Sequence, residues 1–374
     1  MSRLTFFLRD IVARLPGGRR LSAELAQIQR QRDLLRQRLD RSEWQRDVLR
    51  RRLETMRLRS SAAQPDEVVL EHVLPLRHSA IVASIHDGRG AREAAFAARS
   101  APYREAIAET ASRPVDSECV VIGGLSWWIP KRPDESEGME QRLVGKRRLP
   151  LREILETREL AVGRVMIDIG ANVGTTSITR VVLGDFSYVY AAEPDPGNYA
   201  CLVRNVVTNR VQGLVLPDRV AIGDANGEVT LRKLHSGTHH LVTRAADVVE
   251  SERVTVPCLT LDSWVERIGI HLPEVGFIKS DTQGWDLRVV AGASRVLAHR
   301  HIAWQIEFSP AMLQRAGSSI DEAYEAMQRH FTHFIDLRGE SGARTRSTSE
   351  LREALAYVEA GRRYTNVLLY SAAR

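Results

Sequence analysis

The chain has 374 residues, a formal net charge of +6 at pH 7 and 43% hydrophobic residues, which is ordinary for globular proteins. Collagen-like, wholly disordered and disulfide-framework classes are therefore excluded, and the length suggests two units or one large domain with an appendage. No run of about 18 apolar residues occurs, so we expect no transmembrane helix. Cys119, Cys201 and Cys258 share no metal-ligand spacing, which favours the reducing cytoplasm.

The positive charge is concentrated at the N-terminus. Residues 1–60 contain 16 arginines and seven acidic residues, whereas the rest of the chain has slightly more acids than bases. The excess of arginine over lysine is explained more simply by genome composition than by nucleic-acid binding. Because no basic stripe interleaved with aromatic residues follows, we expect no nucleic-acid partner.

The first 60 residues show two helical patterns. Residues 3–15 are basic and amphipathic, and they either extend a helix or make a weak contact with an anionic membrane surface. Residues 21–58 follow a heptad pattern in which eight of eleven a and d positions are apolar; Arg32, Ser42 and Arg46 are the exceptions. This period predicts a coiled coil and hence a homo-oligomer, most simply a dimer. A single long helix packed on its own chain is the alternative.

Deletion of residues 1–60 tests this coiled coil. The shortened chain is expected to keep its cofactor binding and to have a smaller particle mass in light scattering, because the heptad seam is removed. An unchanged particle mass would show that the oligomer contact lies elsewhere.

Residues 61–148 form an accessory region, and residues 149–374 a second, larger unit. The accessory region contains a helical pattern over residues 91–111 and two strand patterns, Cys119–Ile122 and Ser126–Ile129. Trp127 and Trp128 either line a sugar-binding face or pack in the core.

From Arg164 onward, apolar strands alternate with helices, which is typical of an α/β fold with a doubly wound, mostly parallel sheet. The expected strands are Val165–Ile169, Tyr188–Ala192, Val215–Ile222, Val229–Arg232, Val254–Leu259, Gly276–Ser280, Ile302–Glu307, His333–Asp336 and Asn366–Tyr370. The expected helices are Leu149–Leu160, Thr175–Leu183, Gly197–Val207, Leu261–Ile268, Asp286–Val296, Ile320–His330 and Ser349–Ala360. A loop is expected over Gly339–Thr348.

A strand that runs into a glycine turn and a helix gives the strongest chemical signal, Val-Met-Ile-Asp-Ile-Gly-Ala-Asn-Val-Gly over residues 165–174. Such a turn brings backbone N–H groups close to a ligand at the carboxyl edge of the sheet. A dinucleotide fingerprint would place glycines where Asn172 and Thr175 stand, so the spacing disfavours a nicotinamide cofactor. Glu193 follows the next strand, where a carboxylate can accept hydrogen bonds from a ribose diol.

A second cluster, Phe-Ile-Lys-Ser-Asp-Thr-Gln-Gly-Trp-Asp over residues 277–286, also lies between a strand and a helix. Alternation places Phe277, Lys279 and Asp281 on one face of the strand. Lys279 is either functional or the ion-pair partner of Glu307. Asp281 is either functional or a helix N-cap.

These motifs resemble the FkbM family of methyltransferases. The resemblance rests on Asp-Ile-Gly-Ala-Asn-Val-Gly (168–174), Ala-Glu-Pro-Asp (192–195), Val-Ala-Ile-Gly-Asp (220–224), Ile-Lys-Ser-Asp-Thr-Gln-Gly (278–284) and Val-Val-Ala-Gly-Ala (289–293), and covers residues 150–310. It implies a class I, Rossmann-like enzyme that uses S-adenosylmethionine to methylate hydroxyl groups. The family usually has Glu where this chain has Gln283.

The resemblance also implies roles for individual residues. Four of them would hold the methionine part of the cofactor: Asp168, Gly170, Asn172 and Gly174. Glu193 would bind the ribose hydroxyls, Ala221 and Ile222 would lie beside the adenine, and Asp281 would lie near the methyl group.

We therefore expect an O-methyltransferase whose acceptor is a small molecule, sugar or glycan precursor, with Asp281 and Lys279 as catalytic residues and no metal. His239 is a further catalytic candidate, because the pair His239–His240 lies in a segment that could cover the acceptor and histidine titrates near neutral pH. Two other classes stay open. One is a non-catalytic coiled-coil scaffold with a vestigial methyltransferase fold, and the other is a nicotinamide oxidoreductase.

Overall fold

The computed structural model describes residues 91–131, 143, 149–158, 160, 163–232, 240–242, 253–338, 344–361 and 364–371. All of them belong to the unit Ser61–Arg374. The predicted coiled coil at residues 21–58, the amphipathic stretch at residues 3–15 and His239 lie outside the described residues. In the part of the chain that is described, no helix has the length and apolar character needed to cross a membrane.

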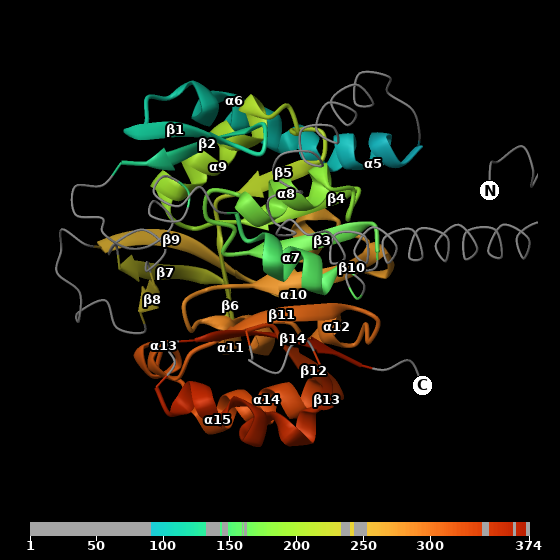
Figure 1. Ribbon diagram of the computed structural model, residues 1–374. Coiled ribbons are helices and arrows are strands. Elements are labelled where there is room, and N and C mark those ends of the chain that lie inside the picture. Colours follow the sequence, from blue (N-terminus) through green and yellow to red (C-terminus); the bar gives the residue numbers. More distant parts are fainter. Residues whose placement is uncertain are drawn as a thin grey trace, which may run out of the picture. The chain divides into compact units, whose positions relative to one another are not determined.

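An eight-stranded sheet forms the centre of this unit (Figure 1). In spatial order the strands are β13 (Thr345–Ser347), β12 (His333–Asp336), β14 (Thr365–Tyr370), β11 (Ala303–Phe308), β10 (Val275–Ser280), β3 (Val165–Ile169), β4 (Tyr188–Ala192) and β5 (Val215–Asp218). The strands from β11 to β5 in this order are parallel, whereas β14 runs antiparallel between β11 and β12. The predicted doubly wound, mostly parallel, Rossmann-like α/β sheet is confirmed.

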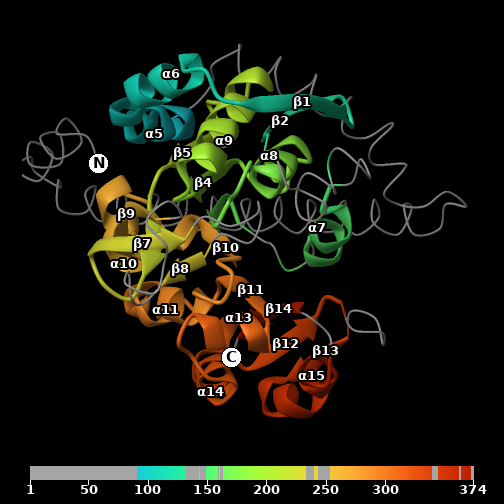
Figure 2. The ribbon, with the colours of Figure 1, turned by 90° about the vertical axis from the view of Figure 1, so that its left-hand side faces the viewer.

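Helices cover both faces of the sheet (Figure 2). Successive side chains of β3 point to opposite faces of the sheet. Ile167 packs into the core with Trp264 of α10 (Leu261–Ile268), whereas Asp168 contacts α8 (Thr175–Val182) on the other face. The other helices described within residues 149–374 are α7 (Leu151–Thr157), α9 (Pro196–Thr208), α11 (Asp286–Ala291), α12 (Ser294–Leu297), α13 (Pro310–Arg315), α14 (Ile320–His330) and α15 (Leu351–Glu359), with short 3-10 turns η6 (Leu272–Glu274) and η7 (Thr348–Glu350).

A second, four-stranded sheet contains β6 (Ala221–Gly223), β9 (Arg253–Thr260), β7 (Gly227–Arg232) and β8 (His240–Val242). The expected single strand Val215–Ile222 is wrong, because the chain turns where the N–H of Val220 donates to the carbonyl of Asp218 (3.2 Å) and then enters this other sheet as β6. The expected single helix Asp286–Val296 is also wrong, because the structure has two helices there, α11 and α12. A Cβ atom at Gly292, where α11 ends, would lie 2.0 Å from the carbonyl oxygen of Gly223, so only glycine permits this close approach to β6.

The accessory region packs on α9 through a β-hairpin of β1 (Ser117–Ile122) and β2 (Leu125–Pro130). Asn205 of α9 accepts from the N–H of Trp128 (2.5 Å) and donates to the carbonyl oxygen of Val173 (2.8 Å), so it joins the hairpin to the glycine turn. Trp127 is fully buried, which supports core packing rather than a sugar-binding face. The expected helix over residues 91–111 is divided into α5 (Ala91–Ser100), η2 (Ala101–Tyr103) and α6 (Arg104–Ser112), with Pro102 in the interruption.

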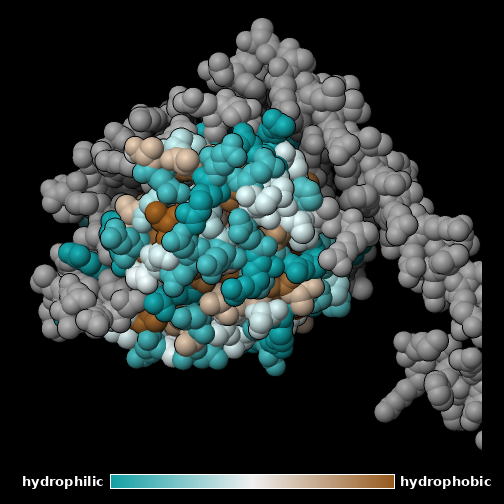
Figure 3. All heavy atoms as spheres, turned by 90° about the horizontal axis from the view of Figure 1, so that it is seen from below, coloured by the Kyte–Doolittle hydropathy of each residue, from teal (hydrophilic) through white to brown (hydrophobic). Residues whose placement is uncertain are grey.

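The C-terminal part differs from its prediction in two elements. The helix α13 was not expected, and β13 forms inside the expected loop Gly339–Thr348 and pairs with β12. Seen from below in Figure 3, the described residues of this face are mostly hydrophilic, and their hydrophobic spots are small and separate. Among all described residues, the large hydrophobic side chains that are exposed are Val121 and Val207.

Candidate active site

The two loops that carry the sequence motifs touch each other at the carboxyl edge of the main sheet. The backbone N–H of Asp281 donates to the carbonyl of Ile169 (3.1 Å), at the end of the neighbouring strand. Gly170 has a φ of +72°, and a Cβ atom on it would lie 2.1 Å from the carbonyl oxygen of Asp281. Gly170 therefore determines how closely the glycine turn approaches Asp281, in addition to any room that it leaves for a ligand.

Glu193 holds the glycine turn from the other side. One of its carboxylate oxygens accepts from the N–H of Asn172 (2.8 Å), and the other accepts from the N–H of Asp195 (2.9 Å). Asn172 itself has a φ of +53°, a conformation that asparagine tolerates better than most residues. Burial, and next the charge of Asp195, raise the pKa of Glu193 to about 8, although the backbone hydrogen bonds oppose this shift.

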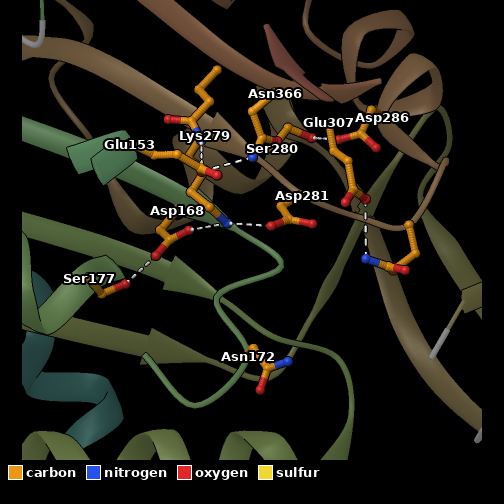
Figure 4. A network of polar contacts seen from close by, with 12 residues as sticks. Glu153, Asp168, Asn172, Ser177, Lys279, Ser280, Asp281, Asp286, Glu307 and Asn366 are labelled. Atoms are coloured by element: carbon orange, nitrogen blue, oxygen red, sulfur yellow. Dashed lines mark hydrogen bonds and ion pairs between the residues drawn. The ribbon is translucent and has the colours of Figure 1, made fainter. Parts of the chain in front are cut away.

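Lys279 lies between two carboxylates, as Figure 4 shows. Its Nζ atom is 3.2 Å from Oδ2 of Asp281 and 3.5 Å from Oδ1 of Asp168. These two acids, rather than Glu307, are thus the ion-pair partners in the described structure. Burial alone would lower the pKa of Lys279, but the charges of Asp281 and Asp168 outweigh it and raise this pKa, so the ammonium group stays protonated.

Asp168 links Lys279 to helix α8. Its side chain is fully buried, and Oδ2 accepts a hydrogen bond of 2.5 Å from the hydroxyl of Ser177 in α8. Sequence reasoning missed Ser177, although its place in the first turn of the helix after the glycine motif was a usable signal.

Asp281 is not the N-cap of α11, because that position belongs to Trp285.

A further acid, Glu307 at the end of β11, completes the cluster. It is buried beside Asp281, and its Oε2 atom accepts from the side-chain amide of Gln283 (3.1 Å). Burial, and next the charges of Asp281 and Asp286, raise the pKa of Glu307 well above its ordinary value, while Lys279 opposes this shift. Burial also raises the pKa of Asp286 to about 6, against a hydrogen bond from Ser280 that lowers it.

Helix α7 is anchored to the same face of the sheet by Glu153. This carboxylate accepts from Arg338 (2.6 Å), Asn366 (2.8 Å) and Gln305 (3.2 Å), so it links the helix to β11 and β14 (Figure 4). The sequence offered no signal for this contact, because the partners lie more than 150 residues apart in the chain.

The remaining predicted site residues lie apart from this cluster. The side chains of Ala221 and Ile222 are buried in two different parts of the core, so a ligand could meet only their backbone. Gly174 has a φ of +88° and caps α8, where a Cβ atom would lie 2.5 Å from the side chain of Leu202. His240 is in β8, opposite Arg232.

The cluster has an accessible rim and a buried layer. Its partly exposed members are Gly170, Asn172, Asp281, Thr282 and Gln283. The buried layer contains Asp168, Glu193, Lys279, Asp286 and Glu307. A ligand at this edge would therefore contact the rim, while the buried charges set the electrostatics of the rim.

We expect turnover without a divalent metal. Among the described residues, no group of three or more histidine, cysteine, aspartate or glutamate side chains is arranged to hold a metal ion. Activity is expected to stay unchanged when EDTA is added. Activity that is lost in EDTA and restored by magnesium would contradict this prediction.

The glycine turn, the acid after β4 and the Lys–Asp pair all occur within a segment that matches a known family model. Residues 168–334 match the model of the methyltransferase FkbM domain. The chain contains an FkbM methyltransferase domain. The cofactor of this domain is S-adenosylmethionine. No curated protein matches the sequence.

Several solved structures of methyltransferases are similar to this chain, with low sequence identity and low TM-scores. Methyltransferase FkbM from Methylobacillus flagellatus KT is 17% identical, with 56% of this chain and 44% of that chain covered and a TM-score of 0.35. This chain therefore spans less than half of that protein. M. jannaschii tRNA m1G37 methyltransferase is 10% identical (70% and 59% covered, TM-score 0.33), and M. jannaschii TYW2 in complex with AdoMet is 10% identical (69% and 86% covered, TM-score 0.29).

The residues of the FkbM domain fit its cofactor. Gly170 and Asn172 both have positive φ values, so the turn between them is a partly exposed backbone cradle. Glu193 receives two backbone N–H groups and a hydrogen bond from the side chain of Asn198. An ionised carboxylate has about four acceptor positions, so in its ionised form Glu193 has room for a hydroxyl donor as well.

Proposed function

We propose that this chain is an O-methyltransferase that transfers a methyl group to a hydroxyl of a sugar, glycan precursor or related metabolite. The observation that carries the proposal is the partly exposed carboxylate of Asp281, which lies at the carboxyl edge of the sheet and is paired with the buried Lys279. Ligands of open α/β sheets bind at this edge. When it is bound, S-adenosylmethionine supplies a methyl group that its positively charged sulfur already activates.

The chain's own residues have two tasks in this proposal. The first is to hold the cofactor, through the turn from Gly170 to Gly174 and through the carboxylate of Glu193. The second is to align the acceptor and remove its proton, because a neutral hydroxyl is a poor nucleophile. Alignment supplies much of the rate, and base assistance adds about 10²–10⁴-fold.

Asp281 is the residue proposed to meet the acceptor hydroxyl. Lys279, at 3.2 Å, favours the ionised form of this carboxylate, which is the form that can accept a proton. Two other rim side chains, Asn172 and Gln283, carry amide groups that can form hydrogen bonds, which favours an acceptor with several hydroxyls. The acids at 168, 193 and 281 are all present in the cluster, which disfavours a vestigial fold.

Cofactor binding can be tested before the acceptor is known. S-adenosylmethionine or its demethylated product is expected to raise the melting temperature of the full chain, because a ligand that binds the folded state stabilises it by mass action. NAD is expected to have no effect. Stabilisation by NAD alone would overturn the proposal.

The acceptor class is tested by incubating the protein with labelled S-adenosylmethionine and separate pools of sugars, glycan precursors and amine-bearing metabolites. Mass spectrometry of the labelled products then gives the methylated atom. Methylation of nitrogen or carbon, but not of oxygen, would contradict the proposed O-methyl transfer.

A further inference from the structure

Gln283 has a backbone conformation that is unusual for its residue type. Its φ is +57°, and among the described residues the other non-glycine positions with a positive φ are Asn172 and Arg210. Such conformations cost free energy, persist only where surrounding contacts hold them, and are concentrated at functional sites. Two of the three positions, Asn172 and Gln283, lie on the rim of the candidate active site. Gln283 is therefore a candidate for a role that the proposed function has not assigned.

The loop that carries Gln283 is held from two sides. The side-chain Nε2 atom donates to Oε2 of the buried Glu307 at 3.1 Å, which is the dashed line at Glu307 in Figure 4. The next residue, Gly284, has a φ of +95°, and a Cβ atom on it would lie 2.3 Å from the carbonyl oxygen of Met312 in α13. The backbone of this loop thus lies directly against α13, and the Gln283 amide has a fixed place at the rim.

Hydrogen bonds to the two rim amides determine which end of each amide is left for a ligand. In Gln283 the NH₂ end contacts Glu307, so the carbonyl oxygen is the end that is left. In Asn172 the carbonyl oxygen accepts from the N–H of Val173 (2.8 Å), so the NH₂ end is left. The rim therefore offers a hydrogen-bond donor on the glycine turn, whereas the loop after β10 offers two acceptors, the Asp281 carboxylate and the Gln283 carbonyl oxygen.

Two acceptors on one short loop select a molecule that brings two donors. The hydroxyl that is methylated can donate to only one of them, and the proposed function assigns it to Asp281. We propose that Gln283 is a specificity-determining residue whose carbonyl oxygen accepts a hydrogen bond from a second hydroxyl of the methyl acceptor. The acceptor is then a polyhydroxy compound rather than one with a single hydroxyl. This inference rests on the proposed O-methyl transfer and adds the recognition of a hydroxyl that does not react.

The contact with Gln283 contributes to binding rather than to the chemical step. The second hydroxyl keeps all its covalent bonds during the reaction, so its hydrogen bond is equally strong in the ground state and the transition state. Uniform binding of this kind lowers KM and leaves kcat unchanged. A hydrogen bond between neutral groups at a partly exposed site changes affinity by about 3- to 10-fold.

The contact is tested with Gln283→Met, which keeps the length of the side chain and removes the amide. The KM for a polyhydroxy acceptor identified as above is expected to rise by about 3- to 10-fold, while kcat and the affinity for S-adenosylmethionine stay nearly unchanged. Gln328→Met in α14 is the matched control, because Gln328 also donates from its amide at 3.1 Å, to the carbonyl of Thr348, and its KM is expected to equal that of the wild type. An unchanged KM in Gln283→Met would overturn the proposal.

Analogues of the acceptor test the same contact in the unaltered protein, so this test does not depend on the folding of a variant. Among analogues that each lack one non-reacting hydroxyl, one is expected to lose as much affinity as Gln283→Met causes. That analogue is expected to lose no more in Gln283→Met, because both changes remove the same hydrogen bond. Fluorine in place of that hydroxyl cannot donate and is expected to be no better than hydrogen. Recovery by fluorine would show that the amide presents its NH₂ end, which overturns the proposal.

Binding is measured before any acceptor is known with D-glucose, D-galactose and myo-inositol as polyhydroxy probes and cyclohexanol as the single-hydroxyl probe. The full chain is labelled with ¹⁵N and saturated with the demethylated cofactor product, and the side-chain amide signal that disappears in Gln283→Met assigns Gln283. At least one polyhydroxy probe is expected to shift this signal, and cyclohexanol is expected to leave it unchanged. A signal that no polyhydroxy probe shifts would overturn the proposal.

The product of methylation separates this inference from the proposed function. Oxygen methylation of a compound with a single hydroxyl, equally efficient in Gln283→Met, would overturn the inference and leave the proposed function intact. Nitrogen methylation of a polyhydroxy compound that Gln283→Met binds more weakly would contradict the proposed O-methyl transfer and leave the contact with Gln283 intact.

Discussion

Replacement of Asp281 by asparagine is expected to lower turnover by about 10²-fold or more, while the affinity for S-adenosylmethionine changes only a few-fold. The substitution keeps the shape of the side chain and removes the charge that would accept the proton. It also leaves the ammonium group of Lys279 with Asp168 as its remaining ion-pair partner among the described residues. Initial rates and a cofactor titration by calorimetry measure the two quantities separately.

A matched control for this variant is Asp321→Asn. Asp321 is an exposed acid in α14 that pairs with Arg352, and exposed ion pairs contribute little to stability. Its turnover is expected to equal that of the wild type. Two results would argue against the role of Asp281. Near-normal turnover of Asp281→Asn would move the search for a base to His239 or His240, and loss of cofactor binding would make Asp281 a cofactor contact.

Replacement of Gly170 by valine is expected to abolish cofactor binding. A Cβ atom at this position would lie 2.1 Å from the carbonyl oxygen of Asp281, so the side chain forces the glycine turn and the Asp281 loop apart. Thermal shift with S-adenosylmethionine measures the loss, and circular dichroism shows whether the variant is folded.

Gly269→Val separates this clash from backbone strain. Gly269 has a φ of +75°, close to the +72° of Gly170, but nothing lies within 4 Å of a Cβ atom built on it. Both variants therefore include the strain of a branched residue at positive φ, about 1–3 kcal/mol. Gly269→Val is expected to be less stable than the wild type but to bind the cofactor. Equal binding by the two variants would show that the contact between Gly170 and Asp281 is unimportant.

The pH dependence of stability follows from the buried acids. The pKa of Glu193 is about 8 in the folded protein, against about 4.3 in an unfolded chain, so the folded state binds the proton more tightly. Its contribution to stability is therefore fully present below the unfolded pKa and is lost as the pH rises towards 8. Glu307 has the same sign, because its pKa is also raised. An ordinary paired carboxylate would show the opposite trend.

The sequence by itself determined the main sheet and the places where chemistry occurs. Apolar strands that alternate with helices have one stable arrangement, a parallel sheet covered on both faces, and glycine turns and acids at strand ends must meet at one edge of it. Val165–Ile169, Tyr188–Ala192 and His333–Asp336 were predicted with the bounds that β3, β4 and β12 have. The periodicity of Phe277 and Lys279 also placed them correctly on one face, where the guanidinium group of Arg180 lies over the ring of Phe277 and the Lys279 ammonium group contacts Asp168.

Only the tertiary structure decided which groups touch. Local pattern cannot show that the chain leaves the main sheet after Asp218, because the strand β6 is defined by a partner, β9, more than 30 residues away. In the same way, the sequence left Asp168, Asp281 and Glu307 as possible ion-pair partners of Lys279. The pairing of β3 with β10 places Asp168 beside Lys279, and the ion pairs that form are those with Asp168 and Asp281. Glu307 became part of the site because β11 pairs with β10 and ends beside the Asp281 loop. Ion pairs depend on distances of a few ångströms between residues far apart in the chain, and these distances are set by packing.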